Sequence, residues 1–284
     1  MSDQSLYAPM LLSEAEFRKL ASFIEKSVGI KMPEQKRLMM QSRLTSRLKA
    51  LHLTSFKEYI EYVFSGKDTD NNEVIMMIDA MTTNLTEFFR EAQHFDYMTN
   101  SVLPRFAQEG RSRIKLWSAG CSTGQEPYTL SIVMSEFISR NPGKITDFSV
   151  LATDVSTKVL NKAQTAIYPM EAIQNIPLDL KRQYFLKSKN PQTAEVRLKP
   201  AIRNRVTFSR LNFMDDDFGF RDTMQIIFCR NVLIYFDKNT QEAVIKKFMQ
   251  YLEPGGYLFL GHSETIFGMD LPLKTVAPTV FQRI

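Results

Sequence analysis

The stretch "LWSAGCSTGQEPYT", Leu116 to Thr129, combines residue types that could do chemistry. A short apolar run leads into a turn rich in glycine and serine, and the turn opens into a segment with helical character. Such a loop can hold a phosphate, present a serine nucleophile, or bind a ligand that has no phosphate. The neighbouring residues decide among these three.

A phosphate is the poorest fit. A phosphate-binding loop needs a lysine after its last glycine, whereas Gly124 is followed by Gln125 and Glu126. A carboxylate in the first helical turn would repel a phosphate. The dinucleotide fingerprint fails as well, because the loop has only Gly120 and Gly124. The sequence therefore excludes a phosphate cradle.

A serine nucleophile fits better. The run Gly120-Cys121-Ser122-Thr123-Gly124 matches the nucleophile elbow G-x-S-x-G, and Asp154 and His262 follow in the order of the α/β-hydrolases. However, Asp154 ends the very next predicted strand, whereas the acid of a hydrolase comes from a strand further along the sheet. A serine hydrolase that uses Ser122 stays the alternative from another class.

The third ligand is a nucleoside with a positive charge and no phosphate, and S-adenosylmethionine has this chemistry. Asp154 closes the second strand, "LATD", where an acid can accept hydrogen bonds from ribose hydroxyls. Taken alone, Asp154 could be a helix N-cap and Glu126 a first-turn acid favoured by the helix dipole. Together, on consecutive strands, the two acids favour this cofactor.

Hydrophobic spacing predicts the elements that position these residues. The first 80 or so residues have the three- and four-residue spacing of helices, at about 12–28, 33–50, 56–64 and 73–81, with the polar loop "SGKDTDNN" before the last. From Arg113 onward, short β-rich runs alternate with helical stretches, which predicts a largely parallel sheet. The segment 168–206 breaks the alternation, and we expect it to be a small β insertion. We expect the final run, "TVFQRI", to be an edge strand.

The predicted fold is therefore an all-α N-terminal domain, 1–82, followed by a Rossmann-like α/β domain, 83–284. The 284 residues carry a net charge of +5. No apolar run approaches the roughly 20 residues of a membrane helix, and the N-terminus lacks the pattern of a secretion signal. The two cysteines have no metal-ligand spacing. We expect a cytoplasmic protein without membrane insertion or a metal.

Several segments together resemble the chemotaxis receptor methyltransferases, the CheR family. They are "MTTNLTEFFRE", "LWSAGCSTGQEPYTLSI", "LATDVSTKVLNKAQTAIY", "IIFCRNVLIYFDKNTQ" and "GYLFLGHSE". The resemblance spans nearly the whole chain. It implies an S-adenosylmethionine-dependent enzyme that converts glutamate side chains of chemoreceptors into methyl esters and releases S-adenosylhomocysteine.

The resemblance also implies site residues. The implied cofactor contacts are Asn84, Thr86, Arg90, Glu126, Asp154, Asn212, Phe213, Asn231 and Val232. Asn84 and Glu87 could also be a capping pair that opens a helix over "LTEFFRE", and both interpretations can hold at once. We expect Arg90 and Tyr235 to orient the acceptor carboxylate and the methionine moiety, with Tyr235 leaving the same strand end as Asn231. No general base is expected, because a glutamate is ionised at neutral pH.

A nucleic-acid methyltransferase is the second alternative. Amine-directed enzymes of that kind carry an Asn/Asp-Pro-Pro-aromatic motif on the corresponding strand. Here the run Asn231-Val232-Leu233-Ile234-Tyr235 has no proline, which disfavours a base amine as the acceptor. We therefore expect no nucleic-acid partner.

Basic residues on the second predicted helix suggest a partner. Lys36, Arg43 and Arg47 share one stripe, and Lys49 lies near the helix end. They could be a solvated surface, but the family uses basic residues here to meet acidic receptor helices. The insertion has no glycine in "LKSKNPQTAEVRLKP" and carries Pro191, so we expect that a receptor C-terminal pentapeptide is not bound. We expect a monomer.

Overall fold

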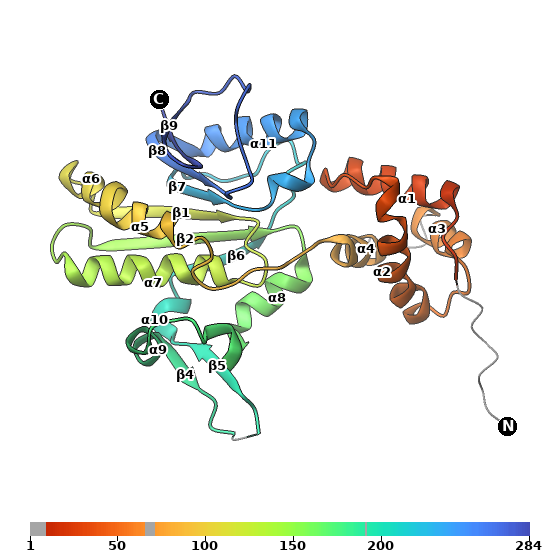
Figure 1. Cartoon of the computed structure of the whole chain (residues 1–284), viewed down its shortest axis with the longest axis horizontal. Coiled ribbons are helices and arrows are strands. Elements are labelled where there is room, and N and C mark those ends of the chain that lie inside the picture. The colour runs from red at the N-terminus through yellow and green to blue at the C-terminus, as the bar shows by residue number, and fades with distance from the viewer. Residues whose placement is uncertain (1–9, 66–71, 191) are drawn as a thin grey trace. The chain divides into compact units, whose positions relative to one another are not determined.

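The structure is a computed structural model that describes residues 10–65, 72–190 and 192–284. Pro191, most of the predicted polar loop and the start of the N-terminal segment lie outside the described residues. Residue contacts divide the chain into two units (Figure 1). A helical unit runs to Thr83 and includes Tyr235–Asp237, and an α/β unit comprises Asn84–Ile234 and Lys238–Ile284.

The helical unit contains α1 (Glu14–Val28), α2 (Arg37–Ala50), α3 (Phe56–Phe64) and α4 (Asn72–Met81), with a 3₁₀ turn, η1 (Glu34–Lys36), before α2. Local signals set the ends of α1. Ser13 and Glu16 form a capping box at its start, and Gly29 ends it in the left-handed region at φ 75°. One face of each helix is buried, as the apolar spacing predicts.

The α/β unit is built on a seven-stranded sheet with the order β6-β2-β1-β7-β8-β10-β9. The strands are β1 (Arg113–Ala119), β2 (Asp147–Asp154), β6 (Val206–Arg210), β7 (Met224–Cys229), β8 (Leu252–Leu260), β9 (Leu273–Ala277) and β10 (Val280–Arg283). The first five strands in the spatial order are parallel, and β10 is antiparallel to both of its neighbours. This mostly parallel sheet confirms the predicted fold class.

The prediction for the last run of the chain was wrong. This run forms β10, which lies between β8 and β9, so β9 is the edge strand. The residues of β9 are partly exposed and lack a clear alternation of buried and exposed positions. The pattern that reveals a strand is therefore absent there, although the strand pairs with β10.

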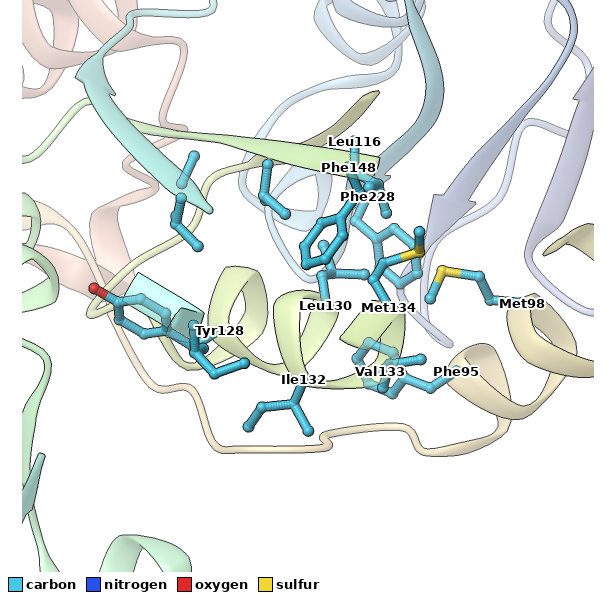
Figure 2. Packing of buried hydrophobic residues seen from close by; sticks show 14 of the residues in the cluster. Phe95, Met98, Leu116, Tyr128, Leu130, Ile132, Val133, Met134, Phe148 and Phe228 are labelled. Carbon is cyan, nitrogen blue, oxygen red and sulfur yellow. The ribbon is translucent and has the colours of Figure 1, made fainter. Parts of the chain in front are cut away.

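Helices cover both faces of the sheet. Successive side chains of β1 point to opposite faces, so neighbouring residues of this strand pack against different helices. Leu116 belongs to the core that includes Leu130 and Met134 of α7 (Gln125–Arg140). Figure 2 shows these side chains together with Phe148 and Phe228 from the neighbouring strands. Trp117 packs edge-on against Phe248 of α11 (Lys238–Tyr251), with ring centroids 5.0 Å apart.

The segment between the two units contradicts one expectation. No helix spans "LTEFFRE", because residues 82–87 are irregular and residues 88–92 form turns before α5 (Gln93–Tyr97). Phe89 and Glu91 have φ values of 56° and 54°, in the left-handed region that interrupts a right-handed helix. The capping-pair interpretation of Asn84 and Glu87 is therefore wrong.

The remaining elements flank the sheet or form the insertion. They are η2 (Met98–Val102), α6 (Leu103–Gln108), α8 (Thr157–Thr165), β3 (Ile167–Pro169), η3 (Met170–Ile173), α9 (Leu178–Tyr184), β4 (Phe185–Lys187), β5 (Glu195–Leu198), α10 (Pro200–Arg203) and η4 (Leu233–Tyr235). The antiparallel sheet β3-β5-β4 forms the small β insertion that the sequence predicts.

Candidate functional site

The carboxyl ends of the five parallel strands meet at one edge of the sheet. In spatial order, the residues that end or follow these strands are Asn212, Asp154, Gly120, Asn231 and Gly261. The chain adds β2 and β6 on one side of β1, and then β7 and β8 on the other. Ligands of open α/β sheets bind where the strand order reverses, which here is between β1 and β7.

Two glycines fix the shape of the loop between β1 and α7. Gly120 has a φ of 85°, and a Cβ on it would lie 2.5 Å from Cγ2 of Val232. Gly124 precedes α7 at a φ of 94°, and a Cβ there would lie 2.9 Å from both the Tyr168 hydroxyl and Cβ of Ala163. Larger side chains would push the loop away from its neighbours. The loop after β1 thus lies directly against the loop after β7.

Asp154 holds the same loop from the end of β2. Its Oδ2 accepts a hydrogen bond from the Ser122 backbone N–H at 2.8 Å, and its Oδ1 accepts one from Ser156 N–H at 3.0 Å. Its own backbone carbonyl accepts from Leu211 N–H, and Asn212 is the residue after Leu211.

Ser122 does not have the surroundings of a nucleophile. Its hydroxyl donates to the Asn84 carbonyl at 2.8 Å, and within the described ranges neither His94 nor His262 hydrogen-bonds to it. A serine nucleophile needs an adjacent general base. Ser122 instead joins the loop to the segment that carries Asn84, so the geometry disfavours the hydrolase alternative.

Glu126 forms a buried ion pair that the sequence did not reveal. Its Oε2 accepts from Nε of Arg230 at 2.8 Å, and its Oε1 accepts from the Ser118 hydroxyl at 2.7 Å. The Arg230 side chain is only 2% exposed and also donates to the Arg90 carbonyl at 2.7 Å. Arg230 follows β7 directly, so it links the loops after β1 and β7 to the segment around Arg90.

The segment 84–92 carries three of the predicted cofactor contacts: Asn84, Thr86 and Arg90 are all half-buried. The Arg90 guanidinium donates to the Leu85 carbonyl at 3.0 Å. The Phe89 N–H donates to the Thr129 hydroxyl of α7 at 3.2 Å. The first bond lies within the segment, and the second ties the segment to α7.

Asn231 and Val232 lie in a turn after β7. Asn231 has a φ of 59°, and its side-chain amide donates to Oε1 of Glu91 at 3.2 Å. The backbone N–H groups of both residues donate to the carboxylate of Glu264, at 3.0 and 2.9 Å. Sequence reasoning missed Glu264 and Glu91, although both fall in the quoted segments "GHSE" and "FFRE".

Phe213, the last of the predicted cofactor contacts, is buried. Its ring lies edge-on to Phe248 of α11, with centroids 5.4 Å apart, and its carbonyl accepts a hydrogen bond from Nζ of Lys247. Of the nine predicted cofactor contacts, six lie at the carboxyl edge of the sheet, and the other three lie in segment 84–92.

Glu91, His94 and His262 offer a possible ligand set for a metal. However, the Arg230 guanidinium lies 3.2 Å from Nδ1 of His94 and 3.5 Å from Oε2 of Glu91, so a cation already occupies this position. Burial, followed by the charge of Arg230, lowers the pKa of His94 to about 4. Burial alone would raise the pKa of Glu91, but Arg230 and hydrogen bonds from Asn231 and His262 hold it below its usual value. The absence of a metal stays a prediction.

The two cysteines are buried and adjoin the crevice loops. Burial raises the pKa of both thiols, and nearby carboxylates raise it further. Both residues are therefore neutral thiols at physiological pH, without the thiolate character of a nucleophile.

In the helical unit, the two arginines of the predicted basic stripe make hydrogen bonds between helices. Arg43 donates to the carbonyls of Ala80, Met81 and Thr82 at the end of α4. Arg47 binds the buried Glu73 with two hydrogen bonds, at 3.0 and 2.6 Å. Arginines with these partners stabilise the helix packing, which the sequence did not predict.

Lys36 and Lys49 are the other two residues of the predicted basic stripe. The Lys36 ammonium donates to the Lys31 carbonyl and lies 5.9 Å from the centroid of the Tyr235 ring. Lys49 is exposed. Tyr235 ends η4 and belongs to the helical unit, where its carbonyl accepts from Lys31 N–H at 2.9 Å. Tyr235 thus does not leave the strand end directly, because the turn at Asn231 and η4 intervene.

Comparison with known families agrees with this geometry. Residues 15–82 match the CheR methyltransferase all-alpha domain, and residues 84–281 match the CheR methyltransferase SAM binding domain. The chain belongs to the CheR methyltransferase family. It is therefore a methyltransferase that uses S-adenosylmethionine.

Relatives from several bacteria are similar over most of their length. The chemotaxis protein methyltransferase of Borreliella burgdorferi is 38% identical over 96% of this chain and 95% of its own. The corresponding protein of Salmonella typhimurium is 35% identical over 96% and 91%, and that of Klebsiella aerogenes is 38% identical over 95% and 90%. Among the helices of the described residues, none is both long and apolar enough to cross a membrane.

Proposed function

We propose that this protein methylates glutamate side chains of chemoreceptors in the cytoplasm, giving glutamate methyl esters and S-adenosylhomocysteine. One observation carries the proposal. The crevice edge of the sheet gathers Asp154, the Glu126–Arg230 pair and Asn231, and its glycine loop has no lysine for a phosphate. This set suits a cationic nucleoside whose ribose has two free hydroxyls.

The residues fit the cofactor chemically. Asp154 ends β2 at the crevice edge of the sheet, and a carboxylate in this position is a suitable acceptor for ribose hydroxyls. We assign the other contacts to Asn84, Thr86, Arg90, Glu126, Asn212, Phe213, Asn231 and Val232. Arg230 already neutralises part of the charge of Glu126, so we expect Asp154 to dominate recognition.

The chemistry needs alignment rather than proton transfer. S-adenosylmethionine would supply a methyl group on a sulfonium, from which the neutral thioether S-adenosylhomocysteine is a good leaving group. A glutamate carboxylate is ionised at neutral pH and attacks without a base. The protein must hold the carboxylate in line with the sulfur–carbon bond. We propose that Arg90 and Tyr235 orient the acceptor, and that no metal takes part.

The partner would be the acidic coiled coil of a chemoreceptor. We propose that Lys36, Arg43, Arg47 and Lys49 contribute the positive charge that steers it, because summed surface charge attracts an acidic partner over long distances. Arg43 and Arg47 also make hydrogen bonds to groups inside the helical unit, so replacing them would disturb its packing. We propose further that a receptor C-terminal pentapeptide is not required, since the insertion strands lack a glycine turn.

A methyl-transfer assay tests the function. Purified protein is incubated with radiolabelled S-adenosylmethionine and a receptor cytoplasmic domain. We expect label that is released as methanol by mild base, as an ester requires, and no label when the acceptor glutamates are replaced by alanine. Stable label on arginine, lysine or nucleic acid would refute glutamate esterification. K36A/K49A should slow transfer at low salt but leave affinity for S-adenosylhomocysteine unchanged.

A further inference from the structure

Glu264 follows β8 and points its carboxylate at the turn after β7. Its side chain receives hydrogen bonds from the backbone N–H groups of one short turn and of its own loop. Oε1 accepts from Val232 at 2.9 Å, Leu233 at 2.7 Å and Ile234 at 3.3 Å, and Oε2 accepts from Asn231 at 3.0 Å and Gly261 at 2.6 Å. Consecutive N–H groups that converge on one anion form a nest.

Burial disfavours the charged form of the Glu264 side chain. Glu264 is 6% exposed, and burial raises its pKa despite the hydrogen bonds from Gly261, Asn231, Val232 and Leu233, which lower it. A raised pKa means that the charged form is less favourable in the folded protein than in the unfolded chain.

The neighbouring contacts leave Asn231 little freedom. Gly261 lies so close that a Cβ on it would be 2.7 Å from the backbone nitrogen of Asn231 and 2.6 Å from its Nδ2. The Asn231 side chain donates to Glu91, while its backbone donates to Glu264. Two carboxylates from distant segments thus fix the left-handed conformation of one residue.

We propose that Glu264 is a positioning residue of the methyltransferase site: its carboxylate shapes the turn Asn231–Ile234, which forms the β7 side of the cofactor crevice. This inference rests on the proposed function, because it assumes that the nucleoside occupies that crevice. Glu264 itself acts through the turn. Its effect should therefore appear in cofactor affinity.

The test compares two carboxylate-to-amide changes at opposite ends of β8. E264Q keeps the size of the side chain but removes the charge and one acceptor oxygen. E253Q is the matched control, since Glu253 lies near the amino end of β8, where it binds Arg111 at 2.5 Å. Calorimetry with S-adenosylhomocysteine should show a roughly tenfold or larger rise in Kd for E264Q and no change for E253Q. Thermal melts accompany both variants.

The outcomes separate the two proposals. If E264Q lowers Tm but leaves Kd unchanged, Glu264 is only structural and the inference is overturned. If the wild type does not bind the nucleoside, the proposed function itself fails. Should E264Q not fold, hydrogen exchange of the wild type decides. Slow exchange of the 231–234 amides supports the nest, and exchange at the rate of an open loop overturns it.

Discussion

The loops on the two sides of the crevice are held in different ways. On the β1 and β2 side, the shape depends on Gly120, Gly124 and backbone hydrogen bonds to Asp154, which all lie within two consecutive β–α units. On the β7 side, the turn at Asn231 is held by Glu91 and Glu264, with Arg230 bridging to Glu126. These groups come from four segments that are far apart in the sequence.

The two sides of the crevice therefore have different physical requirements: backbone conformation in the glycine loop, and paired buried charges on the β7 side. The glycine loop needs residues that tolerate positive φ and close approach, and one carboxylate, Asp154, that binds its backbone. The β7 side buries charges, and buried charges are tolerated only when they are paired or hydrogen-bonded. We therefore expect substitutions on the β7 side to reduce stability more than those on the β1 side.

Arg230 gives the largest expected effect. R230M keeps the length of the side chain but leaves Glu126 and Glu91 without their buried cation. Removing one partner of a buried ion pair costs about 3–5 kcal/mol. We expect a decrease of that size in the free energy of unfolding, measured with urea.

The double variant E126Q/R230M is the control, because it removes a charge from each side of the pair. It should recover part of the lost stability, so that the two substitutions are not additive. A loss of less than about 1 kcal/mol in R230M would show that the network does not hold the β7 side.

His94 gives a smaller effect that depends on pH. Its pKa is about 4 in the folded protein and about 6.5 in the unfolded chain, because burial and the charges of Arg230 and His262 outweigh Glu91. The unfolded chain therefore takes up the proton first, and stability falls as the pH drops from 6.5 towards 4. We expect a loss of about 1–2 kcal/mol between pH 7 and pH 5 from this residue.

Urea titrations of the wild type and H94N at both pH values measure this contribution. H94N has no ring that takes up a proton. The difference in free energy of unfolding between H94N and the wild type should therefore change by about 1–2 kcal/mol between pH 7 and pH 5. Parallel pH curves for the two proteins would mean that His94 is not buried as a neutral ring.

Ser122 gives the smallest effect. S122A removes one hydrogen bond, to the Asn84 carbonyl, which is worth about 1 kcal/mol. We expect turnover within a few-fold of the wild type and no labelling of either protein by a fluorophosphonate probe. Complete loss of activity together with labelling of the wild type would favour the hydrolase instead.

Much of the fold followed from local pattern. The helices of the first unit and the alternation of strands and helices were predicted because burial alternates with regular periods. The strand β9 was missed since its residues are partly exposed and show no period. The helix over "LTEFFRE" was wrongly predicted, because left-handed residues at Phe89 and Glu91 leave no mark that distinguishes them from helix formers.

In the site, likewise, the features that depend on local geometry were predictable from the sequence. Asp154 and the glycine loop are visible in sequence because their geometry is local. The partners of Glu126, Arg43 and Arg47 depend on tertiary contacts across 26 to 104 residues, so the sequence could not show that these charges are already paired. The quoted segment "GHSE" contained Glu264, but only the fold reveals what its carboxylate holds.

Calorimetry with S-adenosylhomocysteine on the wild type and D154A tests the central claim most directly. We expect one binding site in the wild type, and a weakening of roughly 100-fold in D154A, since the hydrogen bonds that we propose between Asp154 and the ribose would be lost. A D154A protein that is folded and binds as tightly as the wild type would contradict the account, as would a wild type that does not bind.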